Sequence, residues 1–99
     1  MVSDEYLEKV RFAIRRNSSS KVDSELKDII EQCREDLIRM GVSKDIANDE
    51  SNKLVLGCQR AFARWQFGIG GDDAIRNRDD YHNMADDLRK SVFEEKEAS

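Results

Sequence analysis

Residues 20–41, SKVDSELKDIIEQCREDLIRMG, carry the pattern that decides the fold. Their apolar side chains recur mostly at intervals of three or four residues, the spacing of one face of an α-helix. Ser20, followed three residues later by Asp23, matches a capping box at the start of this helix. Gly41 stands where a glycine commonly ends a helix. The buried stripe is predicted to consist of Val22, Leu26, Ile29, Ile30, Cys33, Leu37 and Met40.

Two more helices are predicted on either side of this segment. The first runs from about Asp4 to Arg16, with Ser3 as its N-cap. After a loop or short turn at residues 42–48, another runs from about Glu50 to Phe67, with Asp49 as its N-cap. This third helix has apolar residues nearly all round, so we expect it to be the central one. Its core stripe is predicted to be Leu54, Val55, Cys58, Ala61, Phe62 and Trp65.

The glycine-rich run at residues 68–71 ends the third helix, because glycine is a poor helix former. A fourth helix is predicted to follow, capped by Asp72 or Asp73 and running to about Phe93. The polar residues 94–99 are expected to fray. The inward-facing residues of this helix are predicted to be Ala74, Tyr81, Met84, Ala85, Leu88 and Val92.

Length and composition fit one small helical domain. The chain has 99 residues, of which 38% are hydrophobic and 38% charged, and it contains no proline. A lack of proline suits helices joined by short loops better than a turn-rich β fold. The expected fold is therefore all-α: a small four-helix bundle-like domain over residues 1–99, with a central apolar third helix.

Charge is distributed unevenly along the chain. Residues 21–50 contain five basic and nine acidic residues, and residues 72–99 contain the same numbers. Residues 51–71 contain three basic residues and no acidic one. The net charge of −4 argues against nucleic acid as the main partner, because proteins that bind phosphate backbones usually carry a basic excess. No signal peptide or membrane-spanning run is recognisable, so no membrane partner is expected and both cysteines should stay reduced.

Few residues could support chemistry. His82 is the only histidine, and Cys33 and Cys58 lie in apolar stripes away from any metal-ligand spacing with it, so all three are interpreted as structural. The carboxylate pair at 72–73 recurs twice at intervals of seven residues. A solvated acidic face is preferred over a cation ladder, because the loop spacing of an EF-hand is absent. No group combines a nucleophile, a base and an oxyanion donor, so no enzyme activity, cofactor or metal is expected.

Two basic patches are the candidate interface. An exposed aromatic residue among arginines is the usual composition of an interface anchor. The first patch, on the first helix, is Arg11, Phe12, Arg15 and Arg16. The second, on the third helix, is Lys53, Arg60 and Arg64, bordered by Phe67. The second patch could dock onto an acidic subunit, face DNA in a lumen, or pair with acidic helices of the same chain, and the residues alone leave these alternatives open.

Segments spanning most of the chain, in a fixed order, carry a family resemblance. They are YLEKVRFAIR at 6–15, DSELKDIIEQCREDL at 23–37, Gly41-Val42, Phe67-Gly68, Arg78-Asp79-Asp80-Tyr81, Met84 and Leu88. In this order they resemble the small head-tail connector (adaptor) proteins of tailed bacteriophages and prophages, which are also described as DNA-packaging proteins. The glycine-rich turn after Phe67 and the charged tail depart from the family pattern.

The resemblance implies a structural protein of virion assembly without enzyme activity. It implies an oligomeric ring of identical copies beneath the portal protein, to which a tail-completion protein attaches. Genomic DNA would pass through the lumen without sequence-specific binding. The expected location is the virion neck or, for a prophage-encoded protein, the bacterial cytoplasm during assembly.

Two functions of other classes stay open. A small helical regulatory module that binds a host or phage protein would have one discrete partner and form no ring. A DNA-binding module using Lys53, Arg60 and Arg64 would show steeply salt-dependent affinity. The negative net charge makes the DNA-binding module the least favoured of the three.

Overall fold

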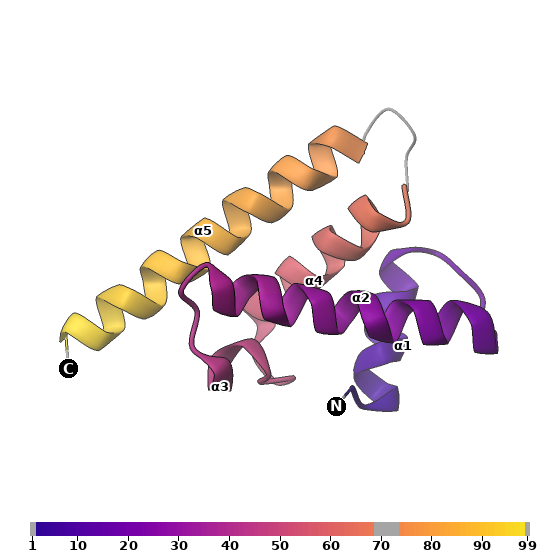
Figure 1. The fold of residues 1–99 in the computed structure, drawn as a ribbon, viewed down its shortest axis with the longest axis horizontal. Coiled ribbons are helices and arrows are strands. Elements are labelled where there is room, and N and C mark those ends of the chain that lie inside the picture. The colour runs from indigo at the N-terminus through magenta and orange to yellow at the C-terminus, as the bar shows by residue number, and fades with distance from the viewer. Residues whose placement is uncertain (1, 69–73, 99) are drawn as a thin grey trace.

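Five α-helices make up the part of the chain that the computed structural model describes, which is residues 2–68 and 74–98, with side chains in the last helix described for residues 75–91. These residues include no β-strand, which confirms the all-α prediction. None of the five helices combines the length and the apolar character that crossing a bilayer requires. They are α1 (Asp4–Ala13), α2 (Ser20–Arg39), α3 (Lys44–Ala47), α4 (Lys53–Gln66) and α5 (Ala74–Ala98), shown in Figure 1.

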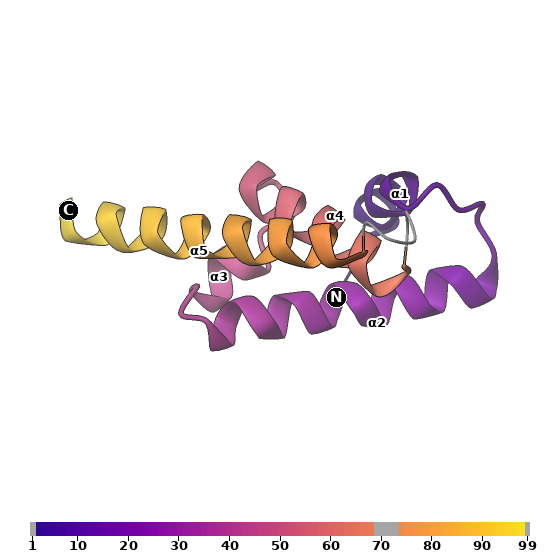
Figure 2. The ribbon, with the colours of Figure 1, turned by 90° about the horizontal axis from the view of Figure 1, so that it is seen from above.

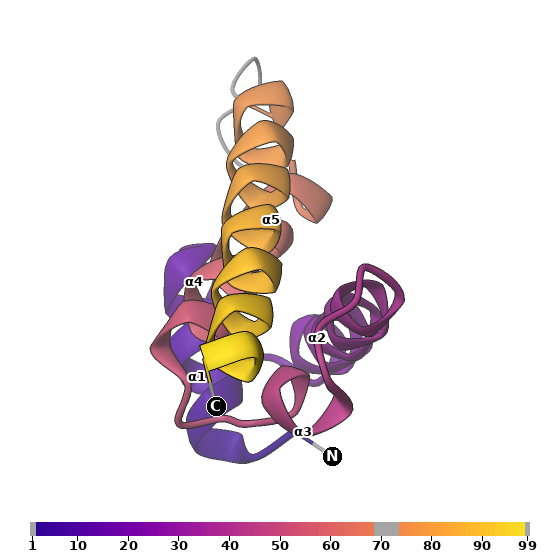
Figure 3. The same cartoon turned by 90° about the vertical axis from the view of Figure 1, so that its left-hand side faces the viewer.

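The other long helices are arranged around α4. It contacts α1, α2 and α5, which agrees with the central place predicted for the third long helix. Figure 1 shows α4 and α5 running side by side in opposite directions, while α2 crosses them obliquely. Seen from above in Figure 2 and from the side in Figure 3, α2 lies in a separate layer from α5. The helix axes therefore do not share one direction, as they would in an up-and-down bundle.

The core lies where α1, α2 and α4 meet, and it continues between α4 and α5. Phe62 of α4 is its aromatic centre, with ring centroids 4.9 Å from Tyr81 and 5.7 Å from Trp65 in edge-on arrangements. Such pairs add about 0.5–1.5 kcal/mol each beyond simple burial. The largest fully buried side chains are Tyr6, Tyr81, Ile14, Leu26, Ile30, Leu37, Gln59, Val10, Val42, Val55, Cys33 and Cys58.

α2 begins one residue earlier than the predicted capping box. Its N-cap is Ser19, whose hydroxyl accepts a hydrogen bond from the amide of Val22 at 3.1 Å. The predicted cap, Ser20, is the first helical residue. The carboxylate of Asp23, which a capping box would direct back to the cap, instead binds Arg11 and the hydroxyl of Ser18. At the other end the prediction is confirmed: Gly41 has a φ of 109°, and the amide of Val42 reaches the carbonyl of Leu37, a Schellman motif.

α4 begins three residues later than predicted. Its N-cap is Asn52, whose side chain accepts hydrogen bonds from the amides of Leu54 and Val55. Asp49, the predicted cap, instead accepts from the amide and hydroxyl of Ser51 in a local turn. The segment predicted as loop or short turn contains the single turn of α3, which Ser43 caps.

Two predicted core residues are exposed. Leu54 is 61% exposed in the first turn of α4, and Met84 is 44% exposed on α5. α5 itself extends to Ala98, beyond the predicted end near Phe93, so the tail expected to fray continues the helix as far as that residue. The predicted caps Asp72 and Asp73 and the inward-facing side chains of Ala74 and Val92 lie outside what the structure describes.

Candidate functional site

Arg11, the first residue of the first predicted patch, is used inside the fold. Its guanidinium lies 3.1 Å from the carboxylate of Asp23 at the start of α2. The two side chains are 18% and 24% exposed, so the ion pair that joins α1 to α2 is partly buried. Arg11 therefore links two helices of the same chain, and its charge is not available to the predicted interface patch.

The other three residues of this patch face solvent. Phe12 is 84% exposed, the most exposed large apolar side chain among the described residues. α1 ends at Ala13 and not at Arg16 as predicted, because Arg15 takes a left-handed φ of 55° that turns the chain away from the helix. Arg15 and Arg16 are exposed and form no ion pair within the described residues. We call Phe12, Arg15 and Arg16 the basic knob.

The second predicted patch is not one continuous stripe. Lys53 is exposed at the first position of α4. Arg60, two turns further along the helix, is half-buried. Arg64 is also half-buried, and its Nε donates a hydrogen bond to the carbonyl of Ala13 at 3.3 Å. Phe67 is the C-cap of α4 and packs against the core. Within the described residues, none of the three basic side chains forms an ion pair with an acidic residue of α2 or α5, which was one of the alternatives left open.

The Arg64 contact brings parts of the two predicted patches together. Ala13 is the last residue of α1 and follows Phe12 directly, so the guanidinium of Arg64 lies beside the base of the basic knob. Lys53 lies at the opposite end of α4, more than two turns away. The structure therefore groups Arg64 with the knob and leaves Lys53 apart.

The acidic residues form two further surfaces. On α2, Asp28, Glu31 and Glu35 are exposed beside an open, shallow hollow of the surface. On α5, Asp79 pairs with Arg78, and Asp86 pairs with both Arg89 and Lys90. These local pairs take up part of the predicted acidic ladder, and the described residues hold no group of His, Cys, Asp and Glu side chains suited to a metal ion.

A groove between α4 and α5 is the feature that sequence reasoning missed. It has a volume of about 280 Å³ and is lined by Lys53, Leu54 and Gly57 from α4 and by Met84, Asp87 and Leu88 from α5. Leu54 and Met84 are the two residues that the periodicity had assigned to the core. The periodicity of apolar residues identifies which face of a helix is apolar. It does not show how much of that face the neighbouring helix covers.

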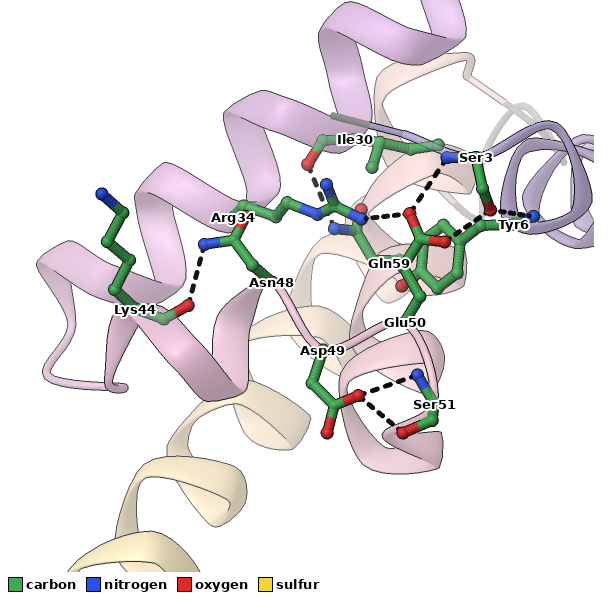
Figure 4. Close-up of polar contacts among 10 residues, drawn as sticks. All are labelled: Ser3, Tyr6, Ile30, Arg34, Lys44, Asn48, Asp49, Glu50, Ser51 and Gln59. Carbon is green, nitrogen blue, oxygen red and sulfur yellow. Dashed lines mark hydrogen bonds and ion pairs between the residues drawn. The ribbon is translucent and has the colours of Figure 1, made fainter.

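A polar network of partly buried and exposed groups joins α1, α2 and the α3–α4 connection (Figure 4). The carboxylate of Glu50 accepts hydrogen bonds from the amide and hydroxyl of Ser3 and from the guanidinium of Arg34, the last at 3.1 Å. Arg34 is only 4% exposed, and its guanidinium lies 5.4 Å from the ring centroid of Tyr6. Burial alone would raise the pKa of Glu50, but the hydrogen bonds from Ser3 and Arg34 outweigh it and hold the pKa below its ordinary value. Nothing in the sequence pattern signals this network, because Ser3 is 47 residues from Glu50.

The cysteines and the histidine considered as possible reactive residues make packing contacts or are buried in the core. Cys33 and Cys58 are free and buried, and burial raises the pKa of the Cys58 thiol to about 11. A thiol with a raised pKa is a poor nucleophile at neutral pH. His82 is exposed on α5, with its ring centroid 5.8 Å from that of Trp65. The hydroxyl of Tyr81 donates a 2.6 Å hydrogen bond to Asp36, which joins α5 to α2.

No protein-family model matches this chain, and no curated protein or solved structure matches it either.

Proposed function

We propose that this small, four-helix bundle-like domain is a structural subunit of a head-tail connector ring of a tailed phage or prophage. The observation that carries the proposal is the presence of two separate surfaces of opposite charge on one short chain. One is the basic knob at the end of α1, and the other is the acidic row of Asp28, Glu31 and Glu35 on α2. A ring subunit needs two different faces, because each copy contacts its neighbours through heterologous contacts.

The partners in this proposal are copies of the same chain, the portal protein on one side of the ring and a tail-completion protein on the other. Genomic DNA passes through the lumen without sequence-specific contacts. The net charge of −4 suits such a channel, because DNA must slide past the wall without being held by its phosphates. The ring belongs to the virion neck, and its subunits reach it from the bacterial cytoplasm during assembly.

The engagement of Arg64 supports a docking role over DNA binding. A phosphate-binding stripe would present Lys53, Arg60 and Arg64 together to solvent. Arg64 instead binds the carbonyl of Ala13, and Arg60 is half-buried. The exposed side chains of Arg15 and Arg16 instead follow the exposed ring of Phe12, which is the composition of a protein contact.

The test is co-expression of the chain with the portal protein encoded in the same phage genome, followed by native mass spectrometry and electron microscopy. We expect several copies of the chain bound to each portal ring. Arg16→Glu should reduce this binding, whereas Lys44→Glu, the same charge change on α3, should not. A monomer or dimer bound to one other protein would instead support the regulatory module, and DNA affinity that falls steeply with salt would support the DNA-binding module.

A further inference from the structure

The groove between α4 and α5 is large enough to admit a side chain from another molecule. Its volume of about 280 Å³ lies below the roughly 300–1,000 Å³ of pockets that enclose small-molecule ligands. Leu88, which is 3% exposed, forms part of its apolar lining, and Leu54 and Met84 are its exposed apolar walls. Gly57 contributes no side chain, and a Cβ added there would lie 3.4 Å from Cε of Met84. The glycine therefore lets the end of Met84 pack close to the backbone of α4 at this side of the groove.

The side chain of Phe12 is a large apolar group that is not buried within its own chain. Its ring is 84% exposed at the end of α1, although aromatic rings gain most from burial. Figures 1 and 2 place α1 toward one end of the molecule and the C-terminal half of α5 toward the other. The bond from Arg64 to Ala13 sets Phe12 beside the last turn of α4, whereas the α4 residues that line the groove, from Lys53 to Gly57, lie in its first turns. The ring and the groove of the same chain therefore lie at opposite ends of α4. A knob on one face and a groove on another are the two halves of a heterologous contact.

The charges around the knob and the groove are complementary. On α1, Glu5 and Glu8 outnumber Lys9 on the turns before Phe12, and Arg15 and Arg16 follow it. In the groove, Lys53 stands on the α4 wall and Asp87 on the α5 wall, and both are exposed. None of Glu8, Lys53 and Asp87 forms an ion pair within the described residues. Along α1 the side chains thus run from acidic through apolar to basic. Across the groove they run from basic Lys53 through apolar residues to acidic Asp87, so the two sequences of charge are complementary.

We propose that the groove between α4 and α5 receives the Phe12 side chain of a second copy of this chain, with Glu8 of that copy beside Lys53 and its Arg15 and Arg16 beside Asp87. The proposal rests on the proposed function, because it names the contact by which the basic knob joins a neighbouring subunit. The acidic row of α2 then remains for the other partners of the ring. The position of Lys53 fits this role. A positive charge in the first turn of a helix opposes the helix dipole, so Lys53 is placed where it does not stabilise its own α4.

Cysteine cross-linking tests the contact with Phe12 left in place. Chains carrying Glu8→Cys are mixed with chains carrying Lys53→Cys and treated with a short bis-maleimide cross-linker. Native Cys33 and Cys58 are buried, so the wild-type chain serves as the unreactive control. Lys44→Cys, an equally simple replacement of an exposed lysine, replaces Lys53→Cys in the matched control. Adding Phe12→Ala to the Glu8→Cys chain removes the proposed anchor without disturbing the core, because the ring is exposed.

The expected product joins position 8 of one chain to position 53 of the other. Phe12→Ala should weaken the association about 10- to 100-fold, the range expected from burying one aromatic ring. A single chain with both cysteines should give a ladder of dimers, trimers and larger species, because the contact is heterologous. Circular dichroism and chemical denaturation of the Phe12→Ala chain should match those of the wild type.

Three results would overturn the contact: no link between positions 8 and 53, an equal link to position 44, or a link that survives Phe12→Ala. The proposed function is judged separately. If rings form on the portal without the cross-link between positions 8 and 53, the proposed Phe12 contact is wrong and the proposed connector function is still supported. A Phe12-dependent link that yields no ladder and no ring on the portal would support the contact and count against the connector.

Discussion

The guanidinium of Arg64 donates a hydrogen bond to the carbonyl oxygen of Ala13 across 3.3 Å, and so joins the last turn of α4 to the last residue of α1. The last carbonyls of a helix have no partner within the helix, so this bond satisfies one of them. It also holds the end of α1 in place, next to Phe12. Arg64, which the sequence analysis placed in the second, outward-facing patch, thus holds in place the helix end that carries the basic knob.

Replacing Arg64 with alanine should therefore lower stability. We expect the free energy of unfolding to fall by about 1–2 kcal/mol, because a half-buried carbonyl loses a charged donor and the side chain loses its packing. Urea denaturation followed by circular dichroism measures this loss. Arg60→Ala is the matched control, since within the described residues Arg60 donates no hydrogen bond to α1, and it should cost less. Equal losses for the two variants would show that the bond to Ala13 contributes nothing.

Replacing Lys53 with glutamate should raise stability while weakening self-association. A negative charge in the first turn of α4 favours the helix dipole, which is worth about 0.3–1 kcal/mol. In the contact that we propose, the same change places a negative charge opposite Glu8 of the neighbour. Denaturation and sedimentation velocity on the same sample measure both effects, and Glu8→Lys in the mixed partner chain should restore association. A variant that is both more stable and equally associated would contradict the placement of Lys53 in the contact.

Replacing Arg15 with glycine should stabilise the folded chain slightly. A left-handed backbone costs a residue with a side chain about 1–2 kcal/mol, while glycine's extra freedom in the unfolded state costs about 0.5–1 kcal/mol. The expected net gain is about 0.5 kcal/mol in thermal or urea denaturation. Arg15→Ala removes the same charge but keeps the strain, so it should show no such gain. A loss of stability in the glycine variant would mean that the φ of 55° carries no strain.

The Glu50 network should make stability depend on pH in the acidic range. Because the folded-state pKa of Glu50 lies below the ordinary value of 4.5, the unfolded chain binds protons more readily. The stabilisation is therefore fully present above about pH 4.5 and is lost as the pH falls through the folded-state pKa. Asp36, whose pKa is also lowered, acts in the same direction: burial opposes the shift, and hydrogen bonds from Tyr81 and Arg39 produce it.

Glu50→Gln isolates this contribution. The variant should lose about 1–3 kcal/mol at neutral pH, because Arg34 no longer faces a carboxylate. Its stability should also vary less between pH 6 and pH 3 than that of the wild type, as measured by urea denaturation at each pH. An identical pH dependence in the two proteins would assign the acid sensitivity to other carboxylates.

The sequence predicted the helices and their buried faces well, because both follow from the periodicity of apolar residues. Gly41 shows the strength of such local rules, since a left-handed C′ position needs only the residues next to it. The predicted start of α4 was wrong because Asp49 and Asn52 are both good caps, and in the structure Asp49 binds Ser51 while Asn52 caps the helix. The role of Arg64 was predicted wrongly and that of Glu50 was not predicted, because Ala13 and Ser3, with which they bond, lie 51 and 47 residues away.

α5 is much longer than the helix that supports it. It has 25 residues and α4 has 14, so at 1.5 Å per residue α5 outreaches α4 by about 16 Å. Amide hydrogen exchange should therefore be graded along α5, slowest beside Phe62 and Tyr81 and faster in the turns that α4 does not reach. In the ring that we propose, the backbone of those outlying turns would extend past the end of α4, where a partner could reach it.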